Sequence, residues 1–386
     1  MNTQTHYREL GIFSDLVSAT RKQRLNLPLP QEQTCSSDSV RRLLNFSFMH
    51  EYPQDVQLHG TWQKDGLISE ELSWSVGYGP PTHAWLLMPA DVQKPLPGVL
   101  ALHDHGAFKY YGREKIANGP QEPARVISKY RENLYEGSAF ANQLARLGFV
   151  VLVHDAFLWG SRKFPLSSMP PSILAMAELC QTTGQENAVG EPEVDIYNAS
   201  AGLHELVLEK YFTLLGTSLA GIVCFEDRLA LNYLAERPEV DAGRLGCMGL
   251  SGGGCRSALL SAVSGRISAA VIAGMMSTYF GLLDHSVSTH TWMLFPAPLP
   301  RFCDWPDLVS QAFTGNLLVQ YNREDNLFTL EGMQAADRRI RENFNIHGSP
   351  HRYTGSFFPG SHKFDRQMQS EAFAWLSKHL QADSNP

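Results

Sequence analysis

The sequence predicts an α/β protein with a mainly parallel central sheet, helices on both faces of that sheet, and long lid-like insertions. The first indication is that short apolar runs alternate with segments of helical periodicity along most of the 386 residues. The second is a hydrophobic content of 43%, which is ample for a large buried core. The third is the turn at 249–253, Gly-Leu-Ser-Gly-Gly, which stands between a predicted strand and a predicted helix.

The amino-terminal part is expected to differ from the rest. Residues 1–64 contain a helical-looking segment near 40–46 and no recognisable chemistry, so we expect a helical extension packed on the main domain. Residues 65–386 are expected to form one large α/β domain. It begins with strands 67–76 and 83–88, which a Gly-Pro-rich turn separates.

A regular alternation of strands and helices follows from residue 97 onwards. Apolar runs predict the strands, and amphipathic stretches ended by glycine or proline predict the helices. The predicted strands are 97–103, 149–155, 244–249, 267–273, 316–321 and 352–358, and the predicted helices are 138–147, 219–236, 255–264, 330–343 and 366–380. Stretches at about 105–137, 164–217 and 278–314 exceed ordinary loop length, which is typical of lids and binding walls.

Charge and cysteine usage limit the class of protein. The formal net charge is −7 and no basic block occurs, so a nucleic-acid partner is not expected. Residues 1–26 lack the apolar core of a secretory signal, and no apolar run is long enough to cross a bilayer, which predicts a cytoplasmic protein without a membrane partner. The six cysteines include no Cys-x-x-Cys pair and are expected to be reduced thiols.

Ser251, at the centre of the 249–253 turn, is the predicted nucleophile. A serine on a tight strand-to-helix turn has strained backbone angles that expose its hydroxyl, and a Cβ on either flanking glycine would collide with neighbouring backbone. The following helix directs its free N–H groups and its positive dipole end at the serine, which stabilises negative charge on a substrate oxygen. An ordinary glycine turn of an α/β protein is the alternative.

A serine hydroxyl needs a base to take its proton and an acid to orient that base. His362 is the predicted base because it follows the last predicted strand in a glycine-containing loop, and a capping or solvated loop histidine is the alternative. Asp325 is the predicted acid, with Glu324 as its competitor, because both follow the strand at 316–321. Asp155 also ends a strand, but a structural ion pair with Arg162 is expected for it.

Two backbone N–H groups are needed to hold a developing oxyanion. Gly252, directly after the nucleophile, is expected to supply one, and the loop after the strand at 97–103 the other. We assign the second donor to His105, with Gly106 as the close competitor. His103 and His105 could be taken for metal ligands, but no third ligand stands at a suitable spacing, so neither a metal nor a cofactor is expected.

With these residues in place, the chain resembles the α/β-hydrolase superfamily, and in particular its dienelactone hydrolase and acetyl xylan esterase-like branch, over roughly residues 65–380. The resemblance rests on the segments 102–107, 154–162 and 249–254, on the loops that carry Asp325 and His362, and on Phe-Ala-Trp-Leu at 373–376. It implies an α/β-hydrolase fold. Dienelactone hydrolases use a cysteine nucleophile where this chain has Ser251, so the resemblance favours an esterase.

The resulting expectation is a serine hydrolase that cleaves a carboxylic ester, of the deacetylase or carboxylesterase type, through a Ser-His-Asp triad and an acyl-enzyme. Its expected substrate is a small-molecule ester, with acylated sugars as candidates, and a homo-oligomer is compatible with the sequence. The alternatives are a peptidase or C–C bond hydrolase on the same scaffold, and a catalytically silent binding protein.

Candidate substrate-binding residues come from the segments around the triad. The segment 108–115 places aromatic rings beside positive charge, which could hold a sugar or a carboxylate, with a solvated lid as the alternative. The candidates are Tyr110, Trp159, His285 and His290, while the neighbouring Trp292 and Met293 belong either to a pocket wall or to the core.

Overall fold

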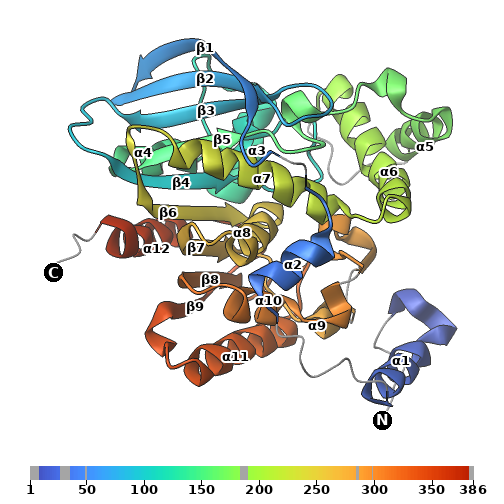
Figure 1. Cartoon of the computed structure of the whole chain (residues 1–386). Coiled ribbons are helices and arrows are strands. Elements are labelled where there is room, and N and C mark those ends of the chain that lie inside the picture. The colour runs from blue at the N-terminus through green and yellow to red at the C-terminus, as the bar shows by residue number, and fades with distance from the viewer. Residues whose placement is uncertain are drawn as a thin grey trace.

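The computed structural model describes residues 8–26, 35–47, 50–182, 190–283, 287–297 and 299–381. Its centre is a nine-stranded sheet in the order β1-β2-β3-β5-β4-β6-β7-β8-β9, which runs from top to bottom in Figure 1. Strands β1, β2, β3 and β5 pair antiparallel, and all pairs from β5 through β4 to β9 are parallel. The strands are β1 Gln54–Lys64, β2 Leu67–Ser75, β3 Thr82–Pro89, β4 Leu96–Leu102, β5 Val150–His154, β6 Val240–Leu250, β7 Ile267–Ala273, β8 Asn316–Asn322 and β9 Tyr353–Phe358.

Helices cover both faces of the sheet and bury two separate hydrophobic clusters. One cluster packs α2, α7, α8, α10 and α11 against the sheet, and the other packs α3, α4 and α12 against the opposite face. The two clusters take alternate residues of each strand: in β4, Leu100 and Leu102 belong to the first, and Val99 and Ala101 to the second. The helices are α1 Asp15–Asn26, α2 Ser37–Leu44, α3 Arg125–Tyr135, α4 Phe140–Arg146, α5 Pro171–Thr182, α6 Pro192–Leu214, α7 Leu219–Ala235, α8 Gly252–Val263, α9 Tyr279–Leu283, α10 Trp305–Gln311, α11 Leu330–Ile346 and α12 Arg366–Leu376.

The sheet begins upstream of the boundary predicted at residue 65. Strand β1 pairs along its length with β2, so the description of residues 1–64 as helical is incomplete. Most of its side chains are exposed, and it lies at the edge of the sheet, where polar side chains disfavour pairing with another chain. The alternation of Val56, Leu58 and Trp62 was the signal available for it.

The three long insertions contain helices that were not predicted. The stretch 105–137 holds α3, the stretch 164–217 holds α5 and α6, and the stretch 278–314 holds α9 and α10. Helix α6 has 23 residues, with a proline in its first turn and Glu193 and Asp195 beside it, which are favourable start signals. Of these helices, α3 and α10 pack against the sheet, and α5 and α6 stand out on the right-hand side of Figure 1.

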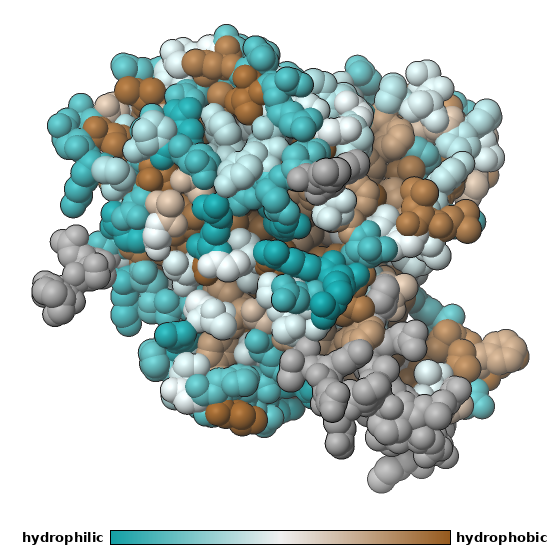
Figure 2. All heavy atoms as spheres, viewed as in Figure 1, coloured by the Kyte–Doolittle hydropathy of each residue, from teal (hydrophilic) through white to brown (hydrophobic). Residues whose placement is uncertain are grey.

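The end of α6 leaves apolar side chains on the surface. Leu214 is 86% and Leu215 is 74% exposed, and Figure 2 shows brown surface at the lower end of this helix. Among the described residues, no single helix has both the length and the apolar character to cross a membrane, although α6 and α7 meet that test together as a pair bent by 86°. No disulfide joins the six cysteines, of which Cys180 is exposed and the others buried.

Candidate active site

Ser251 sits on the sharp turn between β6 and α8 that its motif predicts. Its backbone angles are φ 55° and ψ −117°, a strained conformation for a residue with a side chain. A Cβ on Gly249 would lie 2.6 Å from the Leu102 carbonyl oxygen, and one on Gly253 would lie closer still. The turn is thus pressed against the end of β4, and glycine is required on both sides of the serine.

His362 and Asp325 form a hydrogen bond between the loops that follow β9 and β8. The His362 Nδ1 to Asp325 Oδ2 distance is 2.7 Å, and the side chains are 12% and 0% exposed. Because a carboxylate only accepts, Nδ1 carries the proton and Nε2 is left to act as a base. The other carboxylate oxygen accepts from the Leu327 N–H at 2.8 Å. Glu324 instead accepts from the Gly360 N–H, so the structure pairs His362 with Asp325.

The backbone that bonds to Ser251 also lies close to the His362 ring. The Ser251 N–H donates to the Ala273 carbonyl at 2.8 Å, at the end of β7. The next residue, Gly274, lies so close to the imidazole that a Cβ there would be 3.3 Å from His362 Cε1. The nucleophile candidate and the base candidate therefore lie against adjacent residues, Ser251 against Ala273 and His362 against Gly274.

Gly252 and His105 approach each other across the turn. A Cβ on Gly252 would lie 2.5 Å from the His105 backbone nitrogen. Gly252 is the first residue of α8, whose opening N–H groups have no partner within the helix. Gly106, with φ 57°, faces Tyr130 and Asp104. Of the two predicted donors in this loop, His105 is thus the one whose backbone nitrogen lies against Gly252.

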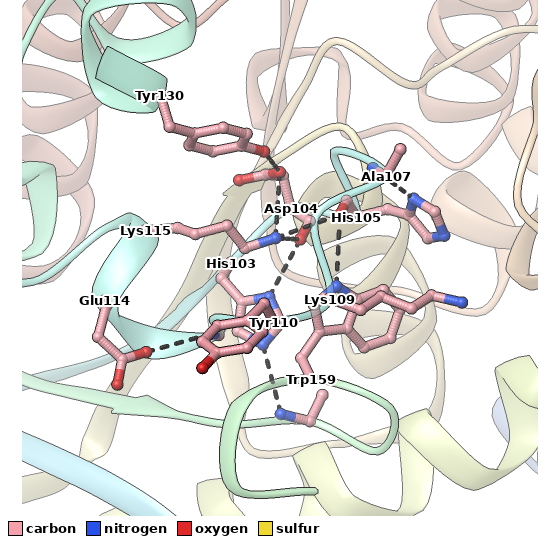
Figure 3. A network of polar contacts seen from close by, with 12 residues as sticks. His103, Asp104, His105, Ala107, Lys109, Tyr110, Glu114, Lys115, Tyr130 and Trp159 are labelled. Carbon is pink, nitrogen blue, oxygen red and sulfur yellow. Dashed lines mark hydrogen bonds and ion pairs between the residues drawn. The ribbon is translucent and has the colours of Figure 1, made fainter. Parts of the chain in front are cut away.

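Side chains hold the His105 loop from two sides. His105 Nδ1 accepts from the Ala107 N–H at 3.0 Å, so Nε2 carries the proton and donates to Glu205 at 3.1 Å. Burial lowers the pKa of His105, and Glu205 opposes that shift only in part. Trp159, which is 1% exposed, lies under the loop and donates from Nε1 to the His105 carbonyl at 3.3 Å (Figure 3).

Glu205, on α6, joins three segments that are far apart in the chain. One carboxylate oxygen accepts from His105 and from the Lys109 ammonium. The other accepts from Thr291 Oγ1 at 2.8 Å and from the Trp292 N–H at 2.9 Å. Burial alone would raise the pKa of Glu205, but Lys109 and His105 outweigh it and hold that pKa well below its ordinary value. Sequence reasoning missed this residue, because its partners are set by the tertiary fold.

Tyr110 and His290, two further substrate-binding candidates, have different neighbours. Tyr110 donates to Glu193 at 2.9 Å, and the Lys163 ammonium lies 4.2 Å from its ring centre. The His290 ring lies 4.9 Å from the Phe328 ring, which in turn stacks on His362 at 6.4 Å. Burial lowers the pKa of His290 to about 4.

The other residues of that group have the following places. Met293 is a core residue at 1% exposure, and Trp292 is 37% exposed. His285 lies outside the described residues. The substrate-binding roles of Tyr110, Trp159, His285 and His290 stay predictions.

Two expectations about charged residues are corrected. Asp155 is ion-paired with Arg113 and not with Arg162, whose partner is Glu226 at 2.6 Å. Lys109 and Lys115 are 2% and 0% exposed, so they neither grip a substrate nor form a solvated lid. Both side chains turn inward because buried carboxylates, Glu205 and Asp104, stand behind the loop. In the part of the chain that the structure describes, no three His, Cys, Asp or Glu side chains are grouped as metal ligands.

Comparison with known proteins places this architecture. No protein-family model matches the chain. YtaP of Bacillus subtilis (strain 168), assigned by name as a hydrolase, is 20% identical over 298 residues, which cover 77% of this chain and 83% of YtaP. A Bacteroides fragilis NCTC 9343 structure assigned as an acetyl xylan esterase superimposes with a TM-score of 0.60, at 13% identity over 83% of this chain and 73% of the other. Glucuronoyl esterase from Solibacter usitatus superimposes with a TM-score of 0.59, at 14% identity over 89% and 92%.

The chain has the α/β-hydrolase fold. In the α/β-hydrolase fold, a nucleophile on the strand-to-helix elbow is followed in the chain by the acid and then by the histidine. Ser251, Asp325 and His362 occur in that order and on the corresponding loops. The oxyanion loop of this fold follows the strand that here is β4, where His105 lies.

Proposed function

We propose that the protein is a serine hydrolase that cleaves a carboxylic ester, with Ser251 as nucleophile, His362 as base and Asp325 as the acid that orients it. The observation that carries the proposal is the 2.7 Å bond between His362 and a fully buried Asp325, beside a serine with φ 55°. A strained serine, a base of fixed tautomer and two converging backbone N–H groups are the parts that acyl transfer needs.

The proposed reaction has two steps. His362 Nε2 takes the Ser251 hydroxyl proton while Oγ attacks the ester carbonyl, and the Gly252 and His105 N–H groups stabilise the oxyanion. The protonated imidazole then returns the proton to the leaving alkoxide as the ester C–O bond breaks, which leaves an acyl-enzyme and an alcohol. Water, deprotonated by His362, attacks that acyl group and restores Ser251 with release of the acid.

The proposed substrate is a small-molecule ester, with acylated sugars as the first class to examine. The support is that the superimposed structures include proteins named as acetyl xylan and glucuronoyl esterases. Because fold alone does not determine the bond that is cleaved, ester hydrolysis is preferred on the serine nucleophile and on these names together. We retain the cytoplasm as the proposed location.

The deciding experiment is exposure of the protein to a fluorophosphonate probe, followed by intact-protein and peptide mass spectrometry. We expect one adduct, on the peptide that contains Ser251, with none in Ser251→Ala and little in His362→Ala. Labelled protein would then be tested on acetylated sugars, short acyl esters, peptides and β-diketones. Labelling without ester turnover would favour a peptidase or C–C bond hydrolase, and no adduct on folded protein would favour a silent scaffold.

A further inference from the structure

Lys115 is a fully buried lysine directly behind the His105 loop. Its side chain is 0% exposed, and its ammonium donates to the Asp104 carbonyl at 2.5 Å and to the His105 carbonyl at 3.2 Å. Figure 3 shows the side chain extended toward these groups, with Tyr130 on the far side of the Asp104 carboxylate. A cation enclosed in this way needs a reason, because removing a charge from water is costly.

The two carbonyls that Lys115 binds belong to the same peptide groups as the two predicted oxyanion donors, the His105 N–H and the Gly106 N–H. In a trans peptide the C=O and the N–H point in opposite directions, and no peptide among the described residues is cis. Holding the Asp104 carbonyl inward therefore turns the His105 N–H outward, toward the side where Gly252 lies against the His105 nitrogen. Holding the His105 carbonyl does the same for the Gly106 N–H, the competing donor.

The surroundings keep the lysine in place. The Asp104 carboxylate lies 3.4 Å from the ammonium and accepts from the hydroxyls of Tyr130 and Tyr135. Burial lowers the pKa of Lys115 to about 8, and Asp104 opposes that shift. Burial would raise the pKa of Asp104, but Lys115 and the two tyrosines outweigh it, so that pKa lies below its ordinary value.

We infer that Lys115 is a positioning residue for ester hydrolysis: it aims and polarises the peptide N–H groups of the His105 loop at the oxyanion without touching substrate. The inference rests on the proposed function for its catalytic consequence. The Asp104 carbonyl also accepts from His103 Nδ1 at 3.1 Å, and the His105 carbonyl also accepts from Trp159 Nε1 at 3.3 Å and from the Phe108 N–H at 3.2 Å. Lys115 is the cation that contacts both carbonyls, and this geometric part of the inference does not depend on activity.

The kinetic test compares Lys115→Met with the wild type on an ester that the wild type turns over. Loss of oriented oxyanion donors should lower kcat by about 100-fold, the order seen when one donor is removed, while KM changes little. A trifluoromethyl ketone, whose serine adduct places an oxyanion at the same point, should bind more weakly by a similar factor. An unchanged kcat in folded Lys115→Met would overturn the inference.

The matched control is Arg162→Met. Arg162 is also a buried cation, paired with Glu226, and it also holds backbone carbonyls, those of Tyr78 and Pro80. It should lose stability without losing kcat. If the two variants lose kcat in proportion to their fall in Tm, Lys115 is only structural and the inference fails.

A second variant and a second readout guard against misfolding. In Lys115→Met/Asp104→Asn the unpaired carboxylate charge is also removed, so we expect recovered Tm without recovered kcat. Hydrogen exchange read by mass spectrometry should show faster exchange at 103–107 in both Lys115 variants and not in Arg162→Met. If the wild type neither labels nor hydrolyses esters, the proposed function fails, while unchanged exchange at 103–107 would refute the positioning role.

Discussion

The two walls of the candidate site use charge in opposite ways. The His362 wall, residues 322–328 and 359–364, contains one buried acid–base pair, and its two loops are joined by backbone bonds such as Arg323 N–H to Phe358 O at 2.9 Å. The His105 wall, residues 103–115, stands on buried charges: Asp104, Lys109, Lys115 and, from α6, Glu205. The first wall presents a group that can move a proton. The charges of the second wall hold backbone N–H donors in place. Buried ions near an active site therefore need not be catalysts.

The largest effect is expected on the His362 wall, with Asp325→Asn. An amide cannot enforce the tautomer that leaves His362 Nε2 unprotonated, so kcat should fall by about 10⁴-fold with little change in KM. The control is Glu324→Gln, since the Glu324 carboxylate accepts from the Gly360 N–H, while His362 is bonded to Asp325. Steady-state kinetics on the best ester substrate decides, and a larger loss in Glu324→Gln than in Asp325→Asn would move the acid to the neighbouring residue.

The next effect is expected where the two walls meet, with Gly252→Ala. The added Cβ would lie 2.5 Å from the His105 nitrogen, so the His105 loop must shift away from the serine. We expect kcat to fall by about 10² to 10³-fold, as for loss of one oxyanion donor. Gly265→Ala, just beyond the other end of α8 with no atom within 4 Å of the new Cβ, should keep wild-type kcat. Equal kcat values for the two variants would show that catalysis does not depend on the close approach of Gly252 to the His105 backbone.

The parts of the molecule that could be predicted from sequence are those set by neighbouring residues. The Ser251 elbow depends on adjacent glycines, and the loops of Asp325 and His362 are marked by the strands before them, so pattern and chain order sufficed. Asp325 was predicted ahead of Glu324, but pattern alone left Glu324 open, because the pairing depends on which side chain turns toward the imidazole.

The loop with His105 was predicted, but the buried charges behind it were not, because the residues that pair there are distant in the chain. Lys109 and Glu205 are separated by 96 positions, and a loop with several lysines is ordinarily exposed. Helix α6, which supplies Glu205, lacks a marked apolar stripe, so a search for helical periodicity passes over it. Its proline and acidic start signals were present, but they fix only one end of a helix.

Glu205→Gln should break stability more than activity. It leaves the Lys109 ammonium, 2% exposed, without a counter-charge, and loss of one partner from a buried pair costs about 3 to 5 kcal/mol of unfolding free energy. The fall in kcat should be smaller than for Gly252→Ala, because Lys115 and Trp159 still hold the His105 backbone. Denaturant unfolding of Glu205→Gln and of Glu205→Gln/Lys109→Met checks this, and the double variant should recover part of the loss. A single variant as stable as the wild type would show that the pair is not a stabilising contact.

The smallest effect is expected one turn further along α6, at Glu209. Burial raises its pKa from an ordinary 4.5 to about 7, and the repelling charge of Glu205 adds to that shift. The Leu219 N–H, which donates to the Glu209 carboxylate at 3.2 Å, opposes the shift only in part. Between pH 4.5 and 7 the folded chain then binds a proton that the unfolded chain has released, so this residue lowers the free energy of unfolding as pH rises through that window. Glu209→Gln should remove that part of the pH dependence and leave kcat unchanged. Unfolding in denaturant at several pH values from 4.5 to 7.5 tests this prediction, with the free energy of unfolding plotted against pH for the wild type and for Glu209→Gln. Equal slopes for the two proteins would mean that Glu209 ionises as freely in the fold as outside it. Of Glu205 and Glu209, only Glu205 would then have its charge set by its surroundings in the fold.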